Sequence, residues 1–316
     1  MRQVGAGVAG RLGFAVPHAA HPAPKAERKF LPMGHVSRKL RERLRGLRTS
    51  LGQLAGLPRA EVPRNVKDIQ QCIEGGLDPL HSAYVSAQNL VSFFAERVSE
   101  FPEFDAYCQE VIAAQDAYMP GGPPMSPLTT SYFSTWAFFD LRFGRDLETI
   151  GTCLLGVSDL LDMDPGMVEI VRQLQGSRMG IYEHCGTRGS KCQLRELATG
   201  SEFICHVASG YRGEAGQLWY VRLCPPFLGL VDYHIVFTTP YVLLDATKAD
   251  WTAYLKRSLI GTVHDTTPQG LCDFLKYGSD GNSWNEFIFQ AYHHHRSDAI
   301  YLAGLPDVKG SLPHAT

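Results

Sequence analysis

The sequence predicts an α+β protein with a helical N-terminal half, a small β module and a set of C-terminal helices. Over residues 36–176, apolar side chains recur every three or four positions, which is the helical period. Over residues 177–245 the pattern changes to short runs that alternate between apolar and polar residues, as strands do. Helical spacing returns over residues 246–316, so we expect C-terminal helices that pack on the body. A hydrophobic content of 44% and a charged content of 20% in 316 residues indicate a folded globular chain.

Residues 1–35 are rich in Gly, Ala, Pro and His and predict a disordered leader. A secretory signal is a second interpretation of this segment, and a true start at Met33 is a third. Gly5, Gly7 and Gly10 have the spacing of the dinucleotide-binding fingerprint, but too few residues precede them to form the strand that such a site requires. We therefore expect no nucleotide cofactor.

The charge is distributed unevenly along the chain. Residues 1–64 carry 13 Lys and Arg but three acidic residues, whereas the remainder carries 17 basic and 29 acidic residues, and the whole chain has a net charge of −2. This division predicts either a basic arm that binds a nucleic acid or a membrane surface, or an arm that lies on its own acidic body.

A basic amphipathic helix is predicted over residues 36–57. Five leucines at steps of four and three form one stripe along it: Leu40, Leu44, Leu47, Leu51 and Leu54. Five basic residues cover the rest of its surface: Lys39, Arg41, Arg43, Arg45 and Arg48. We interpret the helix as a docking element for a protein partner, with Arg41, Arg45 and Arg48 as binding residues. Two other interpretations remain: the leucines pack on the body, or residues 38–48 bind a nucleic acid or a membrane surface.

Helix boundaries in the N-terminal half are predicted from residue pairs that contain proline: Asp78-Pro79, Phe101-Pro102 and Asp164-Pro165. An Asp before Pro caps the first helical turn with its carboxylate, and the fixed φ of Pro suits the first helical position. These pairs predict one helix that begins at Pro79 and ends at Phe101, and another that begins at Pro165. Two buried helices, centred on residues 132–139 and 147–155, are expected between them.

Five short strands are predicted in the β module: Gly180–His184, Lys191–Leu197, Glu202–Ala208, Leu218–Cys224 and Tyr233–Leu244. So many short strands in so few residues indicate a small curled sheet or an SH3-like β-barrel. Three helices are expected after them: Trp251–Leu259, Leu271–Tyr277 and Trp284–His294.

One predicted strand carries aromatic and arginine side chains of the kind that bind peptides or stack on bases. Strand alternation places Trp219 with Val221 on one face and Tyr220 with Arg222 on the other. Because Trp219 shares its face with an apolar neighbour, we expect it to pack in the core. Tyr220 and Arg222 are then predicted to lie at the surface as binding residues.

Three segments near the start of the β module carry a likeness to a known family. Residues 132–140 read Tyr-Phe-Ser-Thr-Trp-Ala-Phe-Phe-Asp, residues 178–183 read Arg-Met-Gly-Ile-Tyr-Glu, and residues 194–200 read Leu-Arg-Glu-Leu-Ala-Thr-Gly. In this order they resemble uncharacterised bacterial proteins, some of which end in a small SEC-C zinc-binding motif. The resemblance implies an aromatic helix pair that leads into a compact β module, and it implies no activity. The closely spaced cysteines of the SEC-C tail are missing here, so the resemblance implies no zinc site.

The histidines and cysteines lack the spacing of a metal site. Zinc sites normally pair ligands two to four residues apart, and the His and Cys residues of the β module are not paired in that way: His184, Cys185, Cys192, Cys205, His206 and Cys224. Residues 293–295 are three consecutive histidines, which on a helix would spread around its surface, so we expect a solvent-facing tip. We therefore expect no metal.

These observations favour a non-enzymatic interaction or adaptor protein that docks on a protein partner through the predicted basic helix. An enzyme of unrecognised type, with a site between the β module and the C-terminal helices, is the first alternative. Its first candidate residues are His206, Asp232, His234 and His264, since catalysis needs a group that titrates near neutral pH. A nucleic-acid-binding protein is the second alternative. No apolar run reaches the roughly 18 residues of a membrane span, and cysteines within apolar patterns indicate a reducing, cytoplasmic setting.

Overall fold

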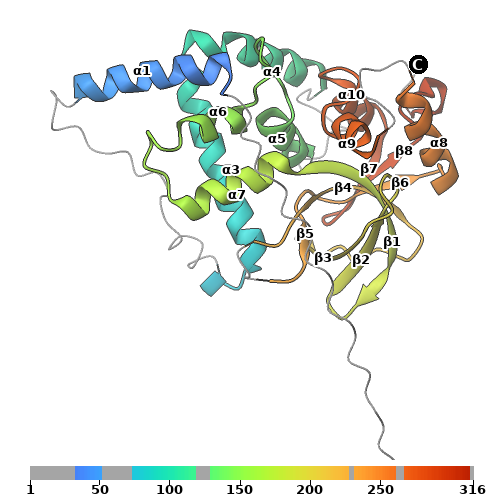
Figure 1. Ribbon diagram of the computed structural model, residues 1–316. Coiled ribbons are helices and arrows are strands. Elements are labelled where there is room, and N and C mark those ends of the chain that lie inside the picture. The colour runs from blue at the N-terminus through green and yellow to red at the C-terminus, as the bar shows by residue number, and fades with distance from the viewer. Residues whose placement is uncertain (1–32, 52–72, 119–128, 228–230, 261–266, 314–316) are drawn as a thin grey trace, which may run out of the picture. The chain divides into compact units, whose positions relative to one another are not determined.

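The computed structural model describes residues 33–51, 73–118, 129–227, 231–260 and 267–313. These residues form one compact unit of helices and a β-sheet, which confirms the α+β prediction (Figure 1). The predicted leader over residues 1–32 and the part of the basic helix beyond Leu51 lie outside the described residues. The division of this unit at residues 176 and 245 stays a prediction.

The N-terminal half is helical, as predicted. Its elements are α1 (His35–Leu51), α3 (Pro79–Val98), the 3-10 turn η1 (Pro102–Phe104), α4 (Asp105–Tyr118), α5 (Thr129–Phe139), α6 (Ile150–Val157) and α7 (Pro165–Gly176). Asp78 Oδ1 accepts hydrogen bonds from the Leu80 and His81 amides at 3.0 and 3.1 Å, and so caps α3. Asp164 caps α7 in the same way. Both helices therefore begin where the Asp-Pro pairs place them.

Five strands form a closed barrel, which confirms the predicted small β module: β1 (Arg178–Arg188), β2 (Lys191–Glu196), β3 (Glu202–Val207), β4 (Leu218–Cys224) and β5 (His234–Val236). The strand order is β1-β2-β3-β5-β4, and the barrel closes because β1 also pairs with β4. β1 is long enough to bond both neighbours, and a bulge between His184 and Gly186 lets it bend from one to the other. The β3–β5 pair is parallel, whereas the other pairs of the barrel are antiparallel.

The C-terminal segment adds helices and also extends the sheet. Its elements are β6 (Tyr241–Leu244), α8 (Lys248–Ser258), α9 (Pro268–Tyr277), α10 (Ser283–Gln290), β7 (Tyr292–His295), β8 (Ile300–Ala303) and the 3-10 turn η2 (Lys309–Ser311). β6, β8 and β7 continue the sheet beyond β4 in that order.

One strand prediction and one helix prediction in this region are wrong. The predicted run over residues 233–244 is two strands, β5 and β6, separated by a segment that contains Pro240, whose nitrogen has no hydrogen to donate to a sheet. The predicted helix over residues 284–294 ends at Gln290, because Tyr292–His295 pairs antiparallel with β8. The three consecutive histidines therefore lie on an exposed edge strand and not on a helix tip.

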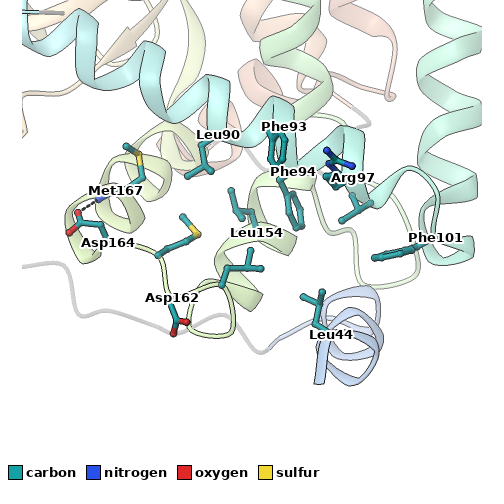
Figure 2. A pocket seen from close by; sticks show the side chains of 13 residues that line it. Leu44, Leu90, Phe93, Phe94, Arg97, Phe101, Leu154, Asp162, Asp164 and Met167 are labelled. Carbon is teal, nitrogen blue, oxygen red and sulfur yellow. Dashed lines mark hydrogen bonds between the residues drawn. The ribbon is translucent and has the colours of Figure 1, made fainter. Parts of the chain in front are cut away.

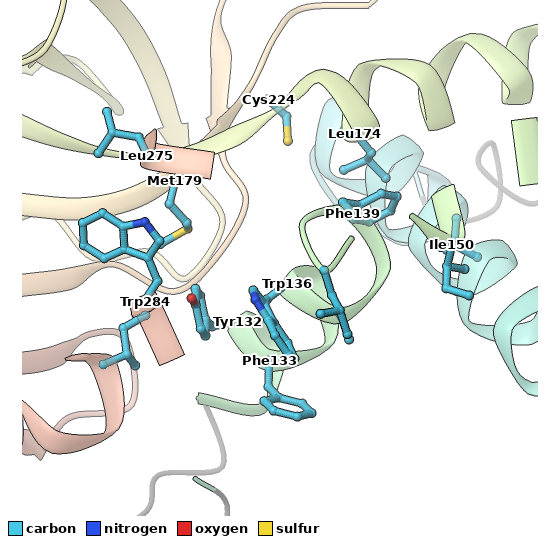
Figure 3. Packing of buried hydrophobic residues seen from close by; sticks show 14 of the residues in the cluster. Tyr132, Phe133, Trp136, Phe139, Ile150, Leu174, Met179, Cys224, Leu275 and Trp284 are labelled. Atoms are coloured by element: carbon cyan, nitrogen blue, oxygen red, sulfur yellow. The ribbon is translucent and has the colours of Figure 1, made fainter. Parts of the chain in front are cut away.

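The hydrophobic core has two parts. The larger part lies between the helices and the outer face of the sheet, and the smaller part fills the barrel. Figure 3 shows Tyr132 of α5 between that helix and the side chains of Met179 and Trp284 in the larger part. β4 faces both parts, so all seven of its residues are buried.

The burial of β4 confirms the predicted position of Trp219 but not those of Tyr220 and Arg222. Trp219 packs inside the barrel, as predicted, and is 0% exposed. The prediction that Tyr220 and Arg222 lie at the surface is wrong, because their side chains are 1% and 0% exposed. Tyr220 stacks on Trp284 of α10, with ring centroids 5.0 Å apart. The alternation of faces was correct, but a helix from the C-terminal segment covers the face that was expected to meet solvent.

Candidate functional site

Helix α1 is held on the body by a buried carboxylate at its first turn. The two oxygens of Glu148 accept hydrogen bonds from the Val36 amide at 2.8 Å and the Ser37 amide at 3.1 Å, and the Ser37 hydroxyl also donates to this carboxylate. Val36 and Leu40 are buried in the larger core. Over its described side chains, α1 therefore packs its leucine stripe on the body, which was one of the interpretations of the sequence.

The basic face of α1 contacts acidic residues of the same chain. Arg41 donates to both oxygens of Asp159 at 2.5 and 2.7 Å and to the Gly156 carbonyl at 2.6 Å. Arg38 lies 3.6 Å from Asp146, and Arg43 lies 3.1 Å from Glu103. The arm thus lies on its own acidic body in the described region. Of the other predicted binding residues, Arg45 is exposed, and the side chain of Arg48 lies outside the described part.

A pocket opens beside α1, between that helix, α3, α6 and α7 (Figure 2). Its volume is about 240 Å³. Ten of its thirteen lining residues are apolar: Leu44, Leu90, Phe93, Phe94, Val98, Phe101, Leu154, Leu161, Met163 and Met167. The other three are charged and are Arg97, Asp162 and Asp164. Apolar lining with a few charged groups is the usual composition of a binding site.

The two sides of the pocket rim differ in charge. On the α1 and α3 side, the guanidinium of Arg97 lies 5.1 Å from the centre of the Phe93 ring, and that of Arg43 lies 4.9 Å from the centre of the Phe101 ring. Such cation–π contacts hold both cations against the pocket walls. The opposite side is the α6–α7 connection, where Asp162 has a φ of 51°, a conformation uncommon for a residue with a side chain.

A second group of polar side chains lies where the barrel meets the start of α3. Asp78 Oδ2 accepts a hydrogen bond from the Tyr233 hydroxyl at 2.5 Å, and His206 Nε2 and Lys191 Nζ each lie 3.9 Å from the same oxygen. Burial raises the pKa of the Asp78 carboxyl, but the hydrogen bonds from Tyr233 and the His81 amide, with His206 and Lys191 nearby, outweigh it and hold this pKa below its ordinary value. Burial lowers the pKa of His206, so its ring is neutral at neutral pH.

The structure does not bring the enzyme candidates together between the barrel and the C-terminal helices. His206 lies with Asp78, Lys191 and Tyr233 (the Asp78 group) where the barrel meets the start of α3. His234 lies beside Phe203, with ring centroids 4.9 Å apart, and pairs across β3–β5 with the residue before His206. Because neighbouring strand residues face opposite sides, the two histidines point apart. Asp232 is exposed, and His264 lies outside the described residues.

We expect Tyr233→Phe to lower the free energy of unfolding by about 1–2 kcal/mol at pH 7, because it removes a hydrogen bond to a charged carboxylate. The folded-state pKa of Asp78 is depressed, so the stability it contributes is present above the unfolded pKa and is lost as pH falls through the folded pKa. The difference between the two proteins should therefore shrink below about pH 4. Urea unfolding at pH 7, 5 and 3 measures it.

Tyr211→Phe is the control for this prediction. The Tyr211 hydroxyl is 3.1 Å from the side-chain oxygen of Gln217, which has no charge to lose over this pH range. Its effect on the unfolding free energy should be the same at all three pH values. An effect of Tyr233→Phe that is equally independent of pH would contradict the role given to the Asp78 charge.

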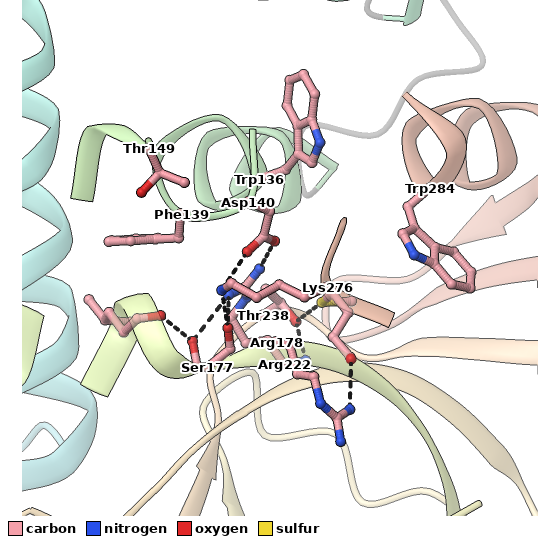
Figure 4. Close-up of polar contacts among 12 residues, drawn as sticks. Trp136, Phe139, Asp140, Thr149, Ser177, Arg178, Arg222, Thr238, Lys276 and Trp284 are labelled. Atoms are coloured by element: carbon pink, nitrogen blue, oxygen red, sulfur yellow. Dashed lines mark hydrogen bonds and ion pairs between the residues drawn. The ribbon is translucent and has the colours of Figure 1, made fainter. Parts of the chain in front are cut away.

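A third polar group is buried between α5, α7, β4 and α9 (Figure 4). Arg222 Nη2 donates to one oxygen of Asp140, and Lys276 Nζ donates to the other at 2.9 Å. Both cations also donate to the carbonyl of Ser177, at 3.0 and 2.6 Å, and Lys276 donates to that of Gln175 at 2.8 Å. Burial lowers the pKa of Lys276 to about 8, against the opposing effect of Asp140. All three ammonium hydrogens have acceptors, which indicates a structural connection between segments.

Neither the pocket nor the buried group of Asp140, Arg222 and Lys276 (the Asp140 group) could be predicted from the sequence. Asp140 is 82 residues from Arg222 and 136 from Lys276, and the pocket draws on four helices. No local spacing signals such contacts.

The chain matches no protein-family model, no curated protein and no solved structure. The resemblance to proteins with a SEC-C motif therefore stays a prediction. Within the described residues, no group of three or more His, Cys, Asp and Glu side chains is placed to hold a metal ion. None of the helices in the described part of the chain combines the length and the apolarity needed to cross a membrane.

Proposed function

We propose that this is a non-enzymatic interaction protein that binds a segment of a partner protein in the apolar pocket beside α1. The pocket itself is the observation that carries this proposal. Basic residues of α1 supply one side of the docking site, although they are Arg43 and Lys39 and not the predicted Arg41, Arg45 and Arg48. The leucines of that helix pack on the body. The apolar contact with the partner is therefore made by the pocket and not by the leucines of α1.

The size of the pocket favours side chains of a partner over a small-molecule ligand. Sites for drug-sized ligands and cofactors usually have volumes of about 300–1,000 Å³. The volume here, about 240 Å³, lies below that range. It suits one or two apolar side chains that anchor a longer segment. Two of the lining residues, Met163 and Met167, have flexible side chains that adapt to the shape of an anchor.

The charges at the rim specify the chemistry of the segment. Arg97 lies on one side, and Lys39 is exposed one turn before Arg43, which lies on that side too but is paired with Glu103. An acidic group beside the anchor would meet these cations, whereas Asp162 and Asp164 on the other side disfavour a second acidic group there. The segment we propose is amphipathic, with apolar anchors and acidic residues at one end. An amphipathic helix in an apolar groove is a common mode of peptide recognition.

The contacts of the basic residues favour binding of a protein segment over binding of a nucleic acid. A five-stranded Greek-key barrel is also the architecture of OB folds, which bind oligonucleotides across their second and third strands. On that face of the present barrel, Arg195 pairs with Glu202 at 2.8 Å and Gln193 donates to the same carboxylate at 2.7 Å. Three arginines of α1 have carboxylate partners as well. These contacts neutralise the cations that a phosphate backbone would need.

Peptide display against the full chain tests the proposal. We expect the selected peptides to share two apolar positions one helical turn apart and acidic residues on one flank. For a selected peptide, Phe93→Ala and Arg97→Glu should each raise the dissociation constant about tenfold or more, which is the loss of one contact of about 1.4 kcal/mol. Deleting α1 would be a poor test, because it would expose Glu148 and the core residues on which Val36 and Leu40 of the helix pack.

Ile112→Ala is the control, because Ile112 is an exposed apolar residue of α4 outside the pocket. It should leave the dissociation constant unchanged. Failure to enrich any peptide, or binding that Phe93→Ala and Arg97→Glu do not weaken, would refute the pocket as a docking site. Selected peptides without acidic residues would refute the role of the basic rim.

A further inference from the structure

Two cysteines face each other inside the barrel. Cys192 on β2 and Cys205 on β3 are direct partners in the antiparallel register of these strands. Both are free thiols, both are buried, and both belong to the apolar cluster that fills the barrel. Because they occupy opposite positions and share the inner face, their sulfur atoms lie side by side within the same apolar layer.

This arrangement meets the geometric requirement for a disulfide. Directly opposite residues of an antiparallel pair have Cα atoms about 4.5–5.5 Å apart. Disulfides span Cα separations of about 4.4–6.8 Å. The strands therefore already hold the two residues at bonding separation, and closing the bond requires rotation of side chains but no shift of register.

We propose that Cys192 and Cys205 form a redox pair that a hydroperoxide converts into a reversible disulfide within the barrel. The chain thereby has a modification site in addition to the docking pocket, and the two proposals rest on different residues.

The opposite pKa shifts of the two thiols favour Cys192 as the one that reacts first. The interaction between the two thiols lowers the pKa of Cys192, and the same interaction together with burial raises the pKa of Cys205. A thiol with a lowered pKa supplies the thiolate that attacks. Cys205, the cross-strand partner of Cys192, is then in place as the resolving thiol.

The reaction balances with one hydroperoxide and two thiols. The Cys192 thiolate attacks an oxygen of hydrogen peroxide, the O–O bond breaks, and hydroxide leaves and takes up a proton to become water. Cys192 becomes a sulfenic acid. The Cys205 sulfur then attacks the Cys192 sulfur, the S–O bond breaks, and a second water leaves with the proton from Cys205. One peroxide is reduced to two waters while two thiols are oxidised to one disulfide.

The pair lies near an end of the β1 and β2 strands. Cys192 is the second residue of β2, and it also pairs with Thr187 near the end of β1, next to the Gly189–Ser190 turn. It thus lies close to one end of the barrel. We choose hydrogen peroxide as the oxidant because it is small, whereas burial of both sulfurs excludes a protein oxidant.

The outer neighbours of the two cysteines both belong to the Asp78 group. Lys191 precedes Cys192 and His206 follows Cys205, so strand alternation directs both toward the face that meets α3. A disulfide between Cys192 and Cys205 would hold β2 and β3 together directly beneath the contact with α3. The disulfide would therefore stabilise the barrel at the point where it contacts the N-terminal helices.

Peptide mapping of the intact chain tests the proposal. The native protein is treated with hydrogen peroxide, the excess peroxide is removed, and the chain is unfolded in the presence of N-ethylmaleimide so that every remaining free thiol is blocked before digestion with trypsin. Cleavage after Lys191, Arg195 and Arg212 leaves Cys192 in the peptide 192–195 and Cys205 in the peptide 196–212. We expect these two peptides to appear joined, with a mass two hydrogens below their sum, and to separate again with dithiothreitol.

Cys185 provides the matched control, because it is a half-buried cysteine of β1 whose peptide, 179–188, is distinct from both. Cys185→Ser should leave the joined peptide unchanged, and Cys192→Ser should abolish it. The oxidised wild-type protein should also unfold at a temperature several degrees higher than the reduced protein, since the bond closes a loop in the unfolded chain.

Two results would overturn the proposal. One is that the peptides 192–195 and 196–212 both carry the maleimide after peroxide treatment of the native protein. The other is that Cys192 is found joined to Cys185 instead. Both results are read from the wild-type chain, so neither depends on whether a variant folds, and neither bears on peptide binding at the pocket.

Discussion

Asp140→Asn is expected to lower the free energy of unfolding by about 3–5 kcal/mol, or to prevent folding, because it leaves buried cations without their counter-charge. Asp140 is the one carboxylate that contacts both Arg222 and Lys276 among the described residues. The Arg222 side chain is fully buried, and that of Lys276 is 8% exposed. Neither can exchange its lost partner for water.

The C-terminal end of α7 supplies the rest of the negative potential. Gln175 and Ser177, whose carbonyls accept from Lys276 and Arg222, lie at the last turn of this helix, where the helix dipole is negative. One carboxylate and one helix end thus balance two cations. Asparagine keeps the shape of the side chain but removes its charge and places an NH2 donor against one of the two cations, so both losses contribute to the expected effect.

Asp159→Asn is the matched control, because it also removes a carboxylate that binds an arginine, but at the surface. The Asp159 side chain is 61% exposed, and surface pairs contribute about 0–1 kcal/mol. Urea unfolding of both variants measures the contrast. If Asp140→Asn does not fold, the triple variant Asp140→Leu, Arg222→Met and Lys276→Met should recover most of the stability. If Asp140→Asn lowers the free energy of unfolding by less than 1 kcal/mol, the buried Arg222 and Lys276 do not need the negative charge of Asp140.

The parts of the fold that depend on local chemistry could be predicted from the sequence. Asp78 and Asp164 each precede a proline, and each caps a helix, because the carboxylate and the amides it accepts from are two or three residues apart. The faces of β4 were also predicted correctly, since alternation is a property of the strand alone.

The parts that depend on distant segments could not be predicted. Trp284 covers Tyr220 from 64 residues along the chain, so no pattern around Tyr220 distinguishes a solvent-facing side from one that a helix covers. Residues 292–295 form a strand because β8 pairs with them. The helical spacing of residues 284–294 predicts that α10 continues through them, but pairing with β8 determines the structure instead. The pocket is assembled from four helices in the same way.

Glu148→Gln is expected to release helix α1 from the body, at a cost of about 2–4 kcal/mol, because buried amides at the start of the helix lose a charged acceptor. Glu148 is buried and accepts from Val36, Ser37 and the Ser37 hydroxyl. A negative charge at a helix N-terminus is also favoured by the helix dipole. Gly34 packs so closely that an added Cβ would lie 2.1 Å from the Glu148 carboxyl carbon, which leaves no room for a displaced side chain.

Hydrogen–deuterium exchange of the native variant measures this release. A local opening free energy lower by 2–4 kcal/mol corresponds to exchange in residues 38–46 that is faster by about 30- to 1,000-fold. Glu103→Gln is the control, since Glu103 also contacts α1, through Arg43, whose side chain is 39% exposed. Its effect on exchange in the same residues should be at most a few-fold.

The Glu148 variant also separates the two roles given to α1. Leu44 lines the pocket and Arg43 lies against its Phe101 wall, so a helix that has left the body takes part of the docking site with it. We expect the affinity for a selected peptide to fall in proportion to the fraction of molecules with α1 released. Full peptide affinity in a variant whose exchange shows α1 released in most molecules would mean that α3, α6 and α7 bind the segment without α1, and that the basic helix only stabilises the fold. Unchanged exchange would instead show that the core contacts of Val36 and Leu40 hold α1 without the carboxylate.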